Sequence, residues 1–190
     1  MDIIDNAVSV LMHDGIVIYP TETVYGLGVD AFSENAILKV YEAKKRPPGQ
    51  PISIAVSSFE MLAAVAFIDS SLQEFIQTFL PGPVTVVLRA KHSLPEMLTG
   101  GTGMIGVRIP AHEVALRLIE GFDAPITATS ANLHGAKDPA TPDECTVPRN
   151  LLIDGGRLPG TPSTVVDLVN RKVLRRGVQA DRIEQFLLSL

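Results

Sequence analysis

The apolar residues near the start of the chain follow two different periods. Between residues 3 and 12 they recur every three or four positions, which predicts an amphipathic helix with Asp2 as its N-cap. From Ile16 to Tyr19 they are consecutive, which predicts a short buried strand that Pro20 ends. The polar segment that follows reads TETVYGLG over residues 21–28. Because open α/β sheets bind ligands where strands end, this segment is the first candidate for part of a binding site.

Helical and strand patterns alternate along the rest of the chain. Helices are predicted at about 36–45, after 57–60, and at 71–79, 111–120 and 181–188. Strands are predicted at 52–56, 84–88, 105–109 and 126–129, followed by a short apolar run at 151–153 and a hairpin of 165–169 with 172–174. No repeat or linker divides the chain, so we expect a single domain over residues 1–190 with an α/β (α+β) fold. Its expected architecture is one twisted mixed parallel/antiparallel sheet with helices packed on it.

The composition agrees with a globular protein. The chain has 190 residues, of which 46% are hydrophobic and 19% charged, enough to bury a proper core. No apolar run reaches membrane-spanning length and the N-terminus lacks a signal pattern, so we expect a soluble, cytoplasmic protein without a membrane partner. The single Cys145 excludes an internal disulfide framework and a cysteine-based metal cluster.

The charge pattern favours a small anionic ligand. The net charge of −5 argues against a broad surface for nucleic acid. Basic residues nevertheless cluster at 44–46 and at 171–176. Local basic clusters in an acidic protein indicate a pocket for a small anion more than a long polyanion.

The general catalytic motifs are either absent from the chain or matched only weakly. The chain has no phosphate-binding P-loop and no nucleophile elbow, and its four histidines lack metal-ligand spacing. Residues 26–31 satisfy the dinucleotide pattern of glycines. However, five residues separate Pro20 from Gly26, and no acidic residue follows about twenty positions later, so this signal is weak.

The remaining candidates are polar residues near predicted strand ends and at one helix end. They are Thr21, Thr23, Tyr25, Lys44, Arg46, Arg108, Ser130, Asn132, Ser163 and Arg175. Hydroxyls and amides give directional hydrogen bonds, and lysine and arginine give positive charge, a set that suits a ligand with phosphates and a carboxylate. The set offers no evident nucleophile. It is typical of catalysis by positioning and charge neutralisation, as in phosphoryl and nucleotidyl transfer.

Seven short blocks resemble the signatures of one family in the same order along the chain. They are YPTETVYGLG at 19–28, KKRP at 44–47, PGPVT at 81–85, VRIP at 107–110, SAN at 130–132, STV at 163–165 and LRRG at 174–177. On these blocks the chain resembles the YrdC family, the threonylcarbamoyl-AMP synthases, in its single-domain form. It departs from many relatives at Gln50, where they carry Lys, Asn or His, and at Ala55, where they carry His.

The resemblance implies a reaction and its partners. L-Threonine, bicarbonate and ATP would give threonylcarbamoyl-AMP and pyrophosphate, for the threonylcarbamoyladenosine modification of tRNA. Mg²⁺ would accompany ATP without a protein-built metal site, and a downstream tRNA threonylcarbamoyl transferase would receive the product.

The resemblance also implies roles for the candidate residues. The catalytic set would be Lys44, Arg46, Ser130 and Asn132. Threonine and bicarbonate would be bound by Thr21, Thr23, Tyr25, Arg108 and Ser163. The nucleotide would be bound by Lys44, Arg46, Ser130, Asn132, Ser163 and Arg175.

Two alternatives stay open at this point. One is an RNA-binding module that uses the two basic clusters, although aromatic residues make up only 5% of the chain and weigh against it. Weak RNA binding beside an enzymatic activity is also compatible with these clusters. The other is a paralogue with a different carbamoyl or acyl substrate.

Overall fold

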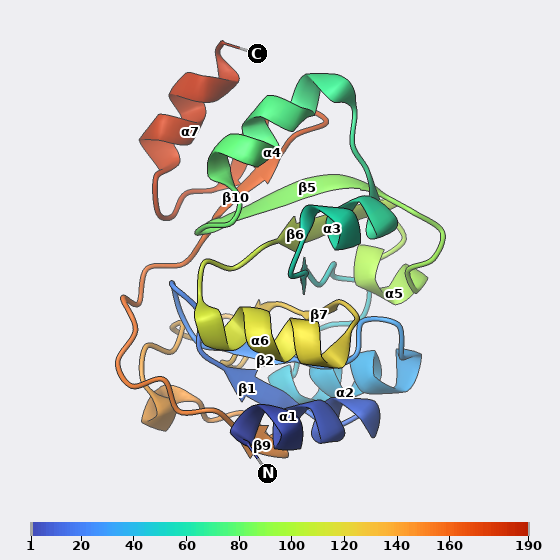
Figure 1. The fold of residues 1–190 in the computed structure, drawn as a ribbon, viewed down its shortest axis with the longest axis vertical. Coiled ribbons are helices and arrows are strands. Elements are labelled where there is room, and N and C mark those ends of the chain that lie inside the picture. Colours follow the sequence, from blue (N-terminus) through green and yellow to red (C-terminus); the bar gives the residue numbers. More distant parts are fainter. Residues whose placement is uncertain (1, 190) are drawn as a thin grey trace.

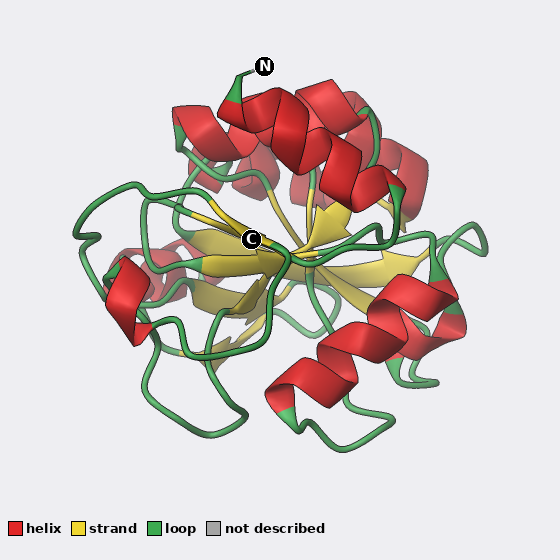
Figure 2. Ribbon diagram, turned by 90° about the horizontal axis from the view of Figure 1, so that it is seen from below, coloured by secondary structure: helices red, strands yellow, loops and turns green. Residues whose placement is uncertain are grey.

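The computed structural model describes residues 2–189, and in this part of the chain the strands form two sheets with helices on the outside (Figure 2). The first sheet has the order β8 (Thr129–Ser130), β2 (Gly26–Gly28), β1 (Val17–Tyr19) and β9 (Leu151–Leu152). The second has the order β11 (Lys172–Arg175), β10 (Thr164–Asp167), β5 (Val84–Ala90), β6 (Met104–Arg108), β3 (Ile54–Ala55) and β7 (Ile126–Thr127), and β4 (Ala66–Phe67) pairs with β5. Both sheets contain parallel and antiparallel pairs, so the predicted mixed α/β class is confirmed, although the strands divide between two sheets.

Four of the helices form two pairs, which lie toward opposite ends of the molecule (Figure 1). The seven α-helices within residues 2–189 are α1 (Ile3–Met12), α2 (Glu34–Lys44), α3 (Phe59–Val65), α4 (Gln73–Phe79), α5 (Glu96–Thr99), α6 (Glu113–Phe122) and α7 (Ala180–Leu187). Near one end α1 lies beside α6, and at the other end α4 lies near α7. Phe75 and Phe79 of α4 pack against Phe186 of α7, with ring centroids 5.7 and 5.4 Å from it.

The first helix and the hydrophobic core follow from the sequence pattern. Asp2 caps α1 and forms a capping box with Asp5, as its position predicts. A smaller apolar cluster joins α1 and α6 to the first sheet through Ile4, Ala7, Leu11, Val17, Tyr19, Ala115, Leu118 and Ile119. A larger cluster fills the rest of the interior. Within residues 2–189, no helix is both long enough and apolar enough to cross a membrane.

The glycines of the opening segment differ from their sequence-based interpretation. The dinucleotide pattern would place them in a tight turn before a helix, but they form β2, which pairs antiparallel with β1. A Cβ atom on Gly26 would lie 2.8 Å from Cζ of Tyr19, and one on Gly28 would lie 2.9 Å from its Cε1. The glycines therefore make room for the Tyr19 ring, and the dinucleotide pattern is fortuitous.

The predicted strand 126–129 is divided between the two sheets. Its first half is β7, beside β3, and its second half is β8, beside β2. Between them the Ala128 amide donates to the Ser53 carbonyl at 2.7 Å. The chain thus crosses from one sheet to the other immediately before Ser130 and Asn132, and this crossing brings both residues to the place where the sheets meet.

Candidate functional site

A polar cavity of about 320 Å³ is lined by residues from both sheets and from the loops beside them. Seven of the ten predicted site residues line it: Lys44, Arg46, Arg108, Ser130, Asn132, Ser163 and Arg175. Segments more than 100 residues apart in the sequence meet here. The structure therefore brings most of the predicted set together in one place.

Lys44 is a buried cation at the C-terminal end of α2, with a relative exposure of 2%. Its ammonium donates to the Asn132 carbonyl at 2.6 Å, to Asn132 Oδ1 at 3.1 Å, and to the Ser130 carbonyl. These three bonds match the three donors of an ammonium group. Burial, and secondarily the charge of Arg46, lower the pKa of Lys44 to about 8, against the opposing effect of Asp138. Lys44 therefore fastens the 130–132 segment to α2 and places a charge beside the cavity.

Ser130 and Asn132 form a closed hydrogen-bond network around that charge. Ser130 Oγ donates to Asn132 Oδ1 at 2.7 Å. Asn132 Nδ2 donates to the Ala136 carbonyl at 2.6 Å and to Asp138 Oδ1 at 3.2 Å. Both donors of the Asn132 amide are thus engaged with protein acceptors, so Asn132 orders this wall of the cavity, while Ser130 Oγ keeps lone pairs with which it can accept.

Three arginines supply the other positive charges. Arg46 donates from Nη2 to the Pro51 carbonyl at 2.7 Å, and Arg175 donates from Nη2 to the Ser163 carbonyl at 2.9 Å. Burial lowers the pKa of both Arg46 and Arg175, although guanidinium groups stay charged in proteins. Arg108 is paired with Glu22 at 2.6 Å.

The charge of the cavity is strongly one-sided. Among its lining residues there are four cations, Lys44 and the three arginines, and a single carboxylate, that of Asp138. Fixed donors and positive charge in a concave site bind anions. The arrangement can therefore hold a multiply charged anion and neutralise charge that develops during transfer of a phosphoryl or nucleotidyl group.

The other three predicted residues lie outside the cavity lining. Thr21 and Thr23 are buried and hydrogen-bonded to each other, with 2.9 Å between their Oγ1 atoms. The Tyr25 phenol donates to the Gly156 carbonyl at 2.7 Å and accepts from the Gly155 amide at 2.9 Å. Their predicted contact with threonine gains no support from these positions.

Five lining residues with polar side chains were not predicted as site residues: Ser53, Thr85, Thr129, His134 and Asp138. Thr85 belongs to the PGPVT block, and its Oγ1 lies 3.0 Å from Ser163 Oγ, so the block itself was the available signal. His134 and Asp138 come from an irregular, polar segment in which no periodicity marks a position. The two departures, Gln50 and Ala55, do not line the cavity, and Ala55 is buried in β3.

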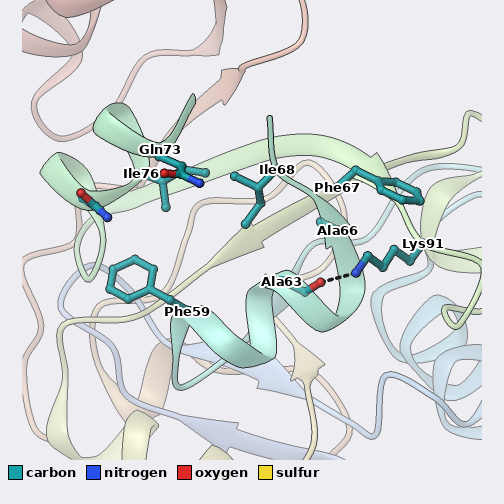
Figure 3. Close-up of a pocket in the computed structure, with 9 residues that line it drawn as sticks. Phe59, Ala63, Ala66, Phe67, Ile68, Gln73, Ile76 and Lys91 are labelled. Carbon is teal, nitrogen blue, oxygen red and sulfur yellow. Dashed lines mark hydrogen bonds between the residues drawn. The ribbon is translucent and has the colours of Figure 1, made fainter. Parts of the chain in front are cut away.

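A second cavity of about 480 Å³ lies over α3, β4 and α4 (Figure 3). Its lining is mostly apolar, with Phe59, Phe67 and Ile76 among its members. Its one cation, Lys91, already donates to the Ala63 carbonyl at 2.6 Å and lies 5.6 Å from the centre of the Phe67 ring. Its other polar side chains, Gln73 and Gln77, carry no charge, so the smaller cavity, with its four cations, is the candidate active site.

Relatives of known name match most of the chain. A threonylcarbamoyl-AMP synthase from Pyrococcus abyssi is 40% identical over 187 residues, which covers 90% of this chain and 53% of the relative. A protein of the same name from Shigella boydii serotype 4 is 33% identical over 187 residues, covering 93% of this chain and 96% of the relative. The crystal structure of P. abyssi Sua5 complexed with L-threonine aligns with a TM-score of 0.86 at 39% identity, covering 92% of this chain and 54% of that one. The chain thus spans about half the length of the Pyrococcus relative and nearly all of the Shigella relative.

The match to a family covers most of the sequence. The Sua5/YciO/YrdC family model, described as "Telomere recombination", matches residues 9–177. This range contains every residue predicted for the site. The chain therefore belongs to the Sua5/YciO/YrdC family.

Proposed function

We propose that this chain is an L-threonylcarbamoyladenylate synthase, a nucleotidyltransferase that makes threonylcarbamoyl-AMP and pyrophosphate from L-threonine, bicarbonate and ATP. The observation that carries the proposal is a cavity lined by four cations and one carboxylate, in a chain whose relatives bear that synthase name. The substrates supply the nucleophile. The amine of threonine captures carbon dioxide with loss of a proton, or bicarbonate with loss of water, to form a carbamate. A carbamate oxygen then attacks the α-phosphorus of ATP as pyrophosphate leaves.

In this proposal the side chains bind and orient two anions that would otherwise repel each other. Arg46 and Arg175 keep N–H groups with which to hold phosphate oxygens, and Arg108 is the candidate for the carboxylate or carbamate of threonine. Lys44 adds charge while its bonds to residues 130 and 132 hold the wall in shape. Donors that are ordered before the reaction stabilise developing charge without reorganisation at the moment of transfer.

Mg²⁺ fits this site only as a companion of ATP. Within residues 2–189 no group of three or more potential His, Cys, Asp or Glu ligands is present, and Asp138 is the single carboxylate of the cavity lining. Mg²⁺ usually keeps several waters and binds through one or two carboxylates plus substrate phosphates. Asp138 would provide one such ligand, and the ion would supply charge neutralisation on the pyrophosphate group.

The product defines the next partner in the proposal. Threonylcarbamoyl-AMP is a mixed anhydride, so a tRNA threonylcarbamoyl transferase must accept its carbamoyl group before water does. The net charge of −5 supports a site for small molecules more than a tRNA-binding face. Transfer of the small product, and not of tRNA, is therefore the expected link between the two enzymes.

The proposal is tested by the substrate dependence of pyrophosphate release. We expect release that requires ATP, threonine and bicarbonate together and that is lost in Arg46→Met, while Arg117→Gln, which changes an exposed arginine outside the cavity, stays active. Release that ignores threonine would contradict the proposal. Release that depends on another amine or acyl donor would indicate the paralogue, and salt-sensitive tRNA binding without turnover would indicate the RNA-binding module.

A further inference from the structure

We infer that the segment Thr21–Thr23 positions Arg108, with Glu22 as the principal positioning residue. Glu22 was not among the predicted site residues, and it does not line the cavity, whereas Arg108 does. The inference rests on the proposed function only for the identity of the anion that Arg108 meets. Its geometric content concerns this chain alone.

The first part of the argument is the ion pair between the two sheets. Arg108 is the last residue of β6, and Glu22 lies in the loop that joins β1 to β2. Arg108 Nη2 donates to Glu22 Oε1 at 2.6 Å, and the two side chains are only 7% and 16% exposed. A charge-assisted bond in such a sheltered place fixes orientation far better than an exposed pair does. Glu22 therefore holds the guanidinium from behind the cavity wall.

The second part is the direction of the hydroxyl chain. Thr21 Oγ1 lies 2.7 Å from the Val24 carbonyl, which can only accept, so the single hydroxyl proton of Thr21 is donated there. The 2.9 Å bond between Thr21 Oγ1 and Thr23 Oγ1 must then use the proton of Thr23. Thr23 Oγ1 can consequently only accept from Arg108 Nη1, which lies 3.3 Å away. Neither threonine has a hydroxyl proton left to donate to a substrate, and Thr23 Oγ1 keeps one lone pair with which it can still accept.

The third part is the set of Arg108 N–H donors that the 21–23 segment does not engage. A guanidinium has five N–H donors, and the described residues engage one on Nη2 and one on Nη1. Both engaged donors face the 21–23 segment. Of the three remaining donors, Nε is buried, and one proton on each Nη belongs to a side chain that lines the cavity. The two bonds to the segment fix the orientation of these Nη protons. The segment thus converts a flexible arginine into a fixed anion-binding group.

The inference is tested first by NMR of the Arg108 side chain, a readout that needs no substrate. In the wild-type chain the Nη protons of Arg108, assigned by their loss in Arg108→Lys, should be resolved and exchange slowly with water. In Glu22→Gln, which keeps the shape and one accepting oxygen but removes the charge, these signals should average and exchange fast. Thr23→Val should disturb the Nη1 protons alone, and Arg117→Gln should leave all of them unchanged. Resolved, slowly exchanging signals in Glu22→Gln would overturn the inference.

A double-mutant cycle then tests whether Glu22 acts through Arg108. We expect Glu22→Gln to lower kcat/KM for pyrophosphate release by about 100-fold, the scale of an ångström-size misplacement of a binding group. In an Arg108→Met background the same change should have no further effect. Independent, multiplying effects would show that Glu22 does not act through Arg108. A wild-type chain that orders Arg108 but releases no pyrophosphate would refute the proposed function and leave the positioning inference standing.

Discussion

Replacing Lys44 with methionine should change how the stability of the protein depends on pH. Lys44 is 2% exposed, and burial lowers its pKa from an ordinary 10.5 to about 8. Between these two values the unfolded chain carries a proton on Lys44 that the folded chain has lost. Because the unfolded state binds more protons in this window, the free energy of unfolding gains a contribution that rises with pH from about 8 to 10.5.

The size of the effect follows from the same two values. A pKa difference of this size corresponds to about 3 kcal/mol, as an upper bound for a group that could relax toward solvent. Lys44→Met lacks the titrating group, so the wild type should gain up to about 3 kcal/mol of stability relative to the variant across this window. Below pH 8 the difference between the two proteins should be constant.

The assay is urea unfolding of both proteins at several pH values from 7 to 10, with Lys45→Met, a change at the exposed neighbour, as the matched control. Subtracting each variant from the wild type at the same pH removes the titration of the tyrosines and the other lysines. A difference for Lys44→Met that stays flat or falls as the pH rises would refute the description of Lys44 as a buried charge held by three acceptors.

Three further predictions concern single positions. Arg46→Met should lower turnover, measured as pyrophosphate release, by about two orders of magnitude, and full turnover would contradict its role. The same change should keep the free energy of unfolding in urea within about 1 kcal/mol of the wild type, because Arg46 donates a hydrogen bond to Pro51 and is partly exposed. Gly26→Ala should destabilise the fold by about 1–3 kcal/mol because its Cβ would press on Tyr19, and an unchanged unfolding midpoint would count against this packing. The Cys145 thiol should react with alkylating reagents only after unfolding, since burial raises its pKa to about 11, and rapid labelling of the native protein would contradict that assignment.

The sequence predicted those parts of the fold that depend on local pattern. The first helix, the strand ended by Pro20 and the hairpin of β10 and β11 all follow from periodicity and caps within the segment itself. β2 was missed because glycine has little strand propensity, and its reason for being there is the Tyr19 ring on the neighbouring strand. The division of 126–130 between two sheets depends on which partners Ala128 finds, and no local signal carries that information.

In the candidate site, too, residue types were predictable from the sequence, whereas side-chain directions depended on tertiary contacts. Lys44, Arg46 and Ser130 were predicted from charge and from blocks in register, and the fold brings them to one cavity. Thr21 and Thr23 were candidates for a binding site because they carry hydroxyls at a strand end, and the family resemblance implied that they bind threonine. The orientation of those hydroxyls is set by the Val24 carbonyl, and Thr23 accepts from Arg108, which lies on a strand of the other sheet. The chemistry of these residues was therefore readable from the sequence, and the direction of their side chains was not.

The central claim is that the cavity joins a carbamate of threonine to AMP. Its most direct test is mass spectrometry of the products formed from ATP, L-threonine and ¹³C-labelled bicarbonate. The account predicts an adenylate with the mass of threonylcarbamoyl-AMP that carries the ¹³C label, together with pyrophosphate in equal amount. An unlabelled adenylate, or ATP cleavage that proceeds without threonine, would contradict it.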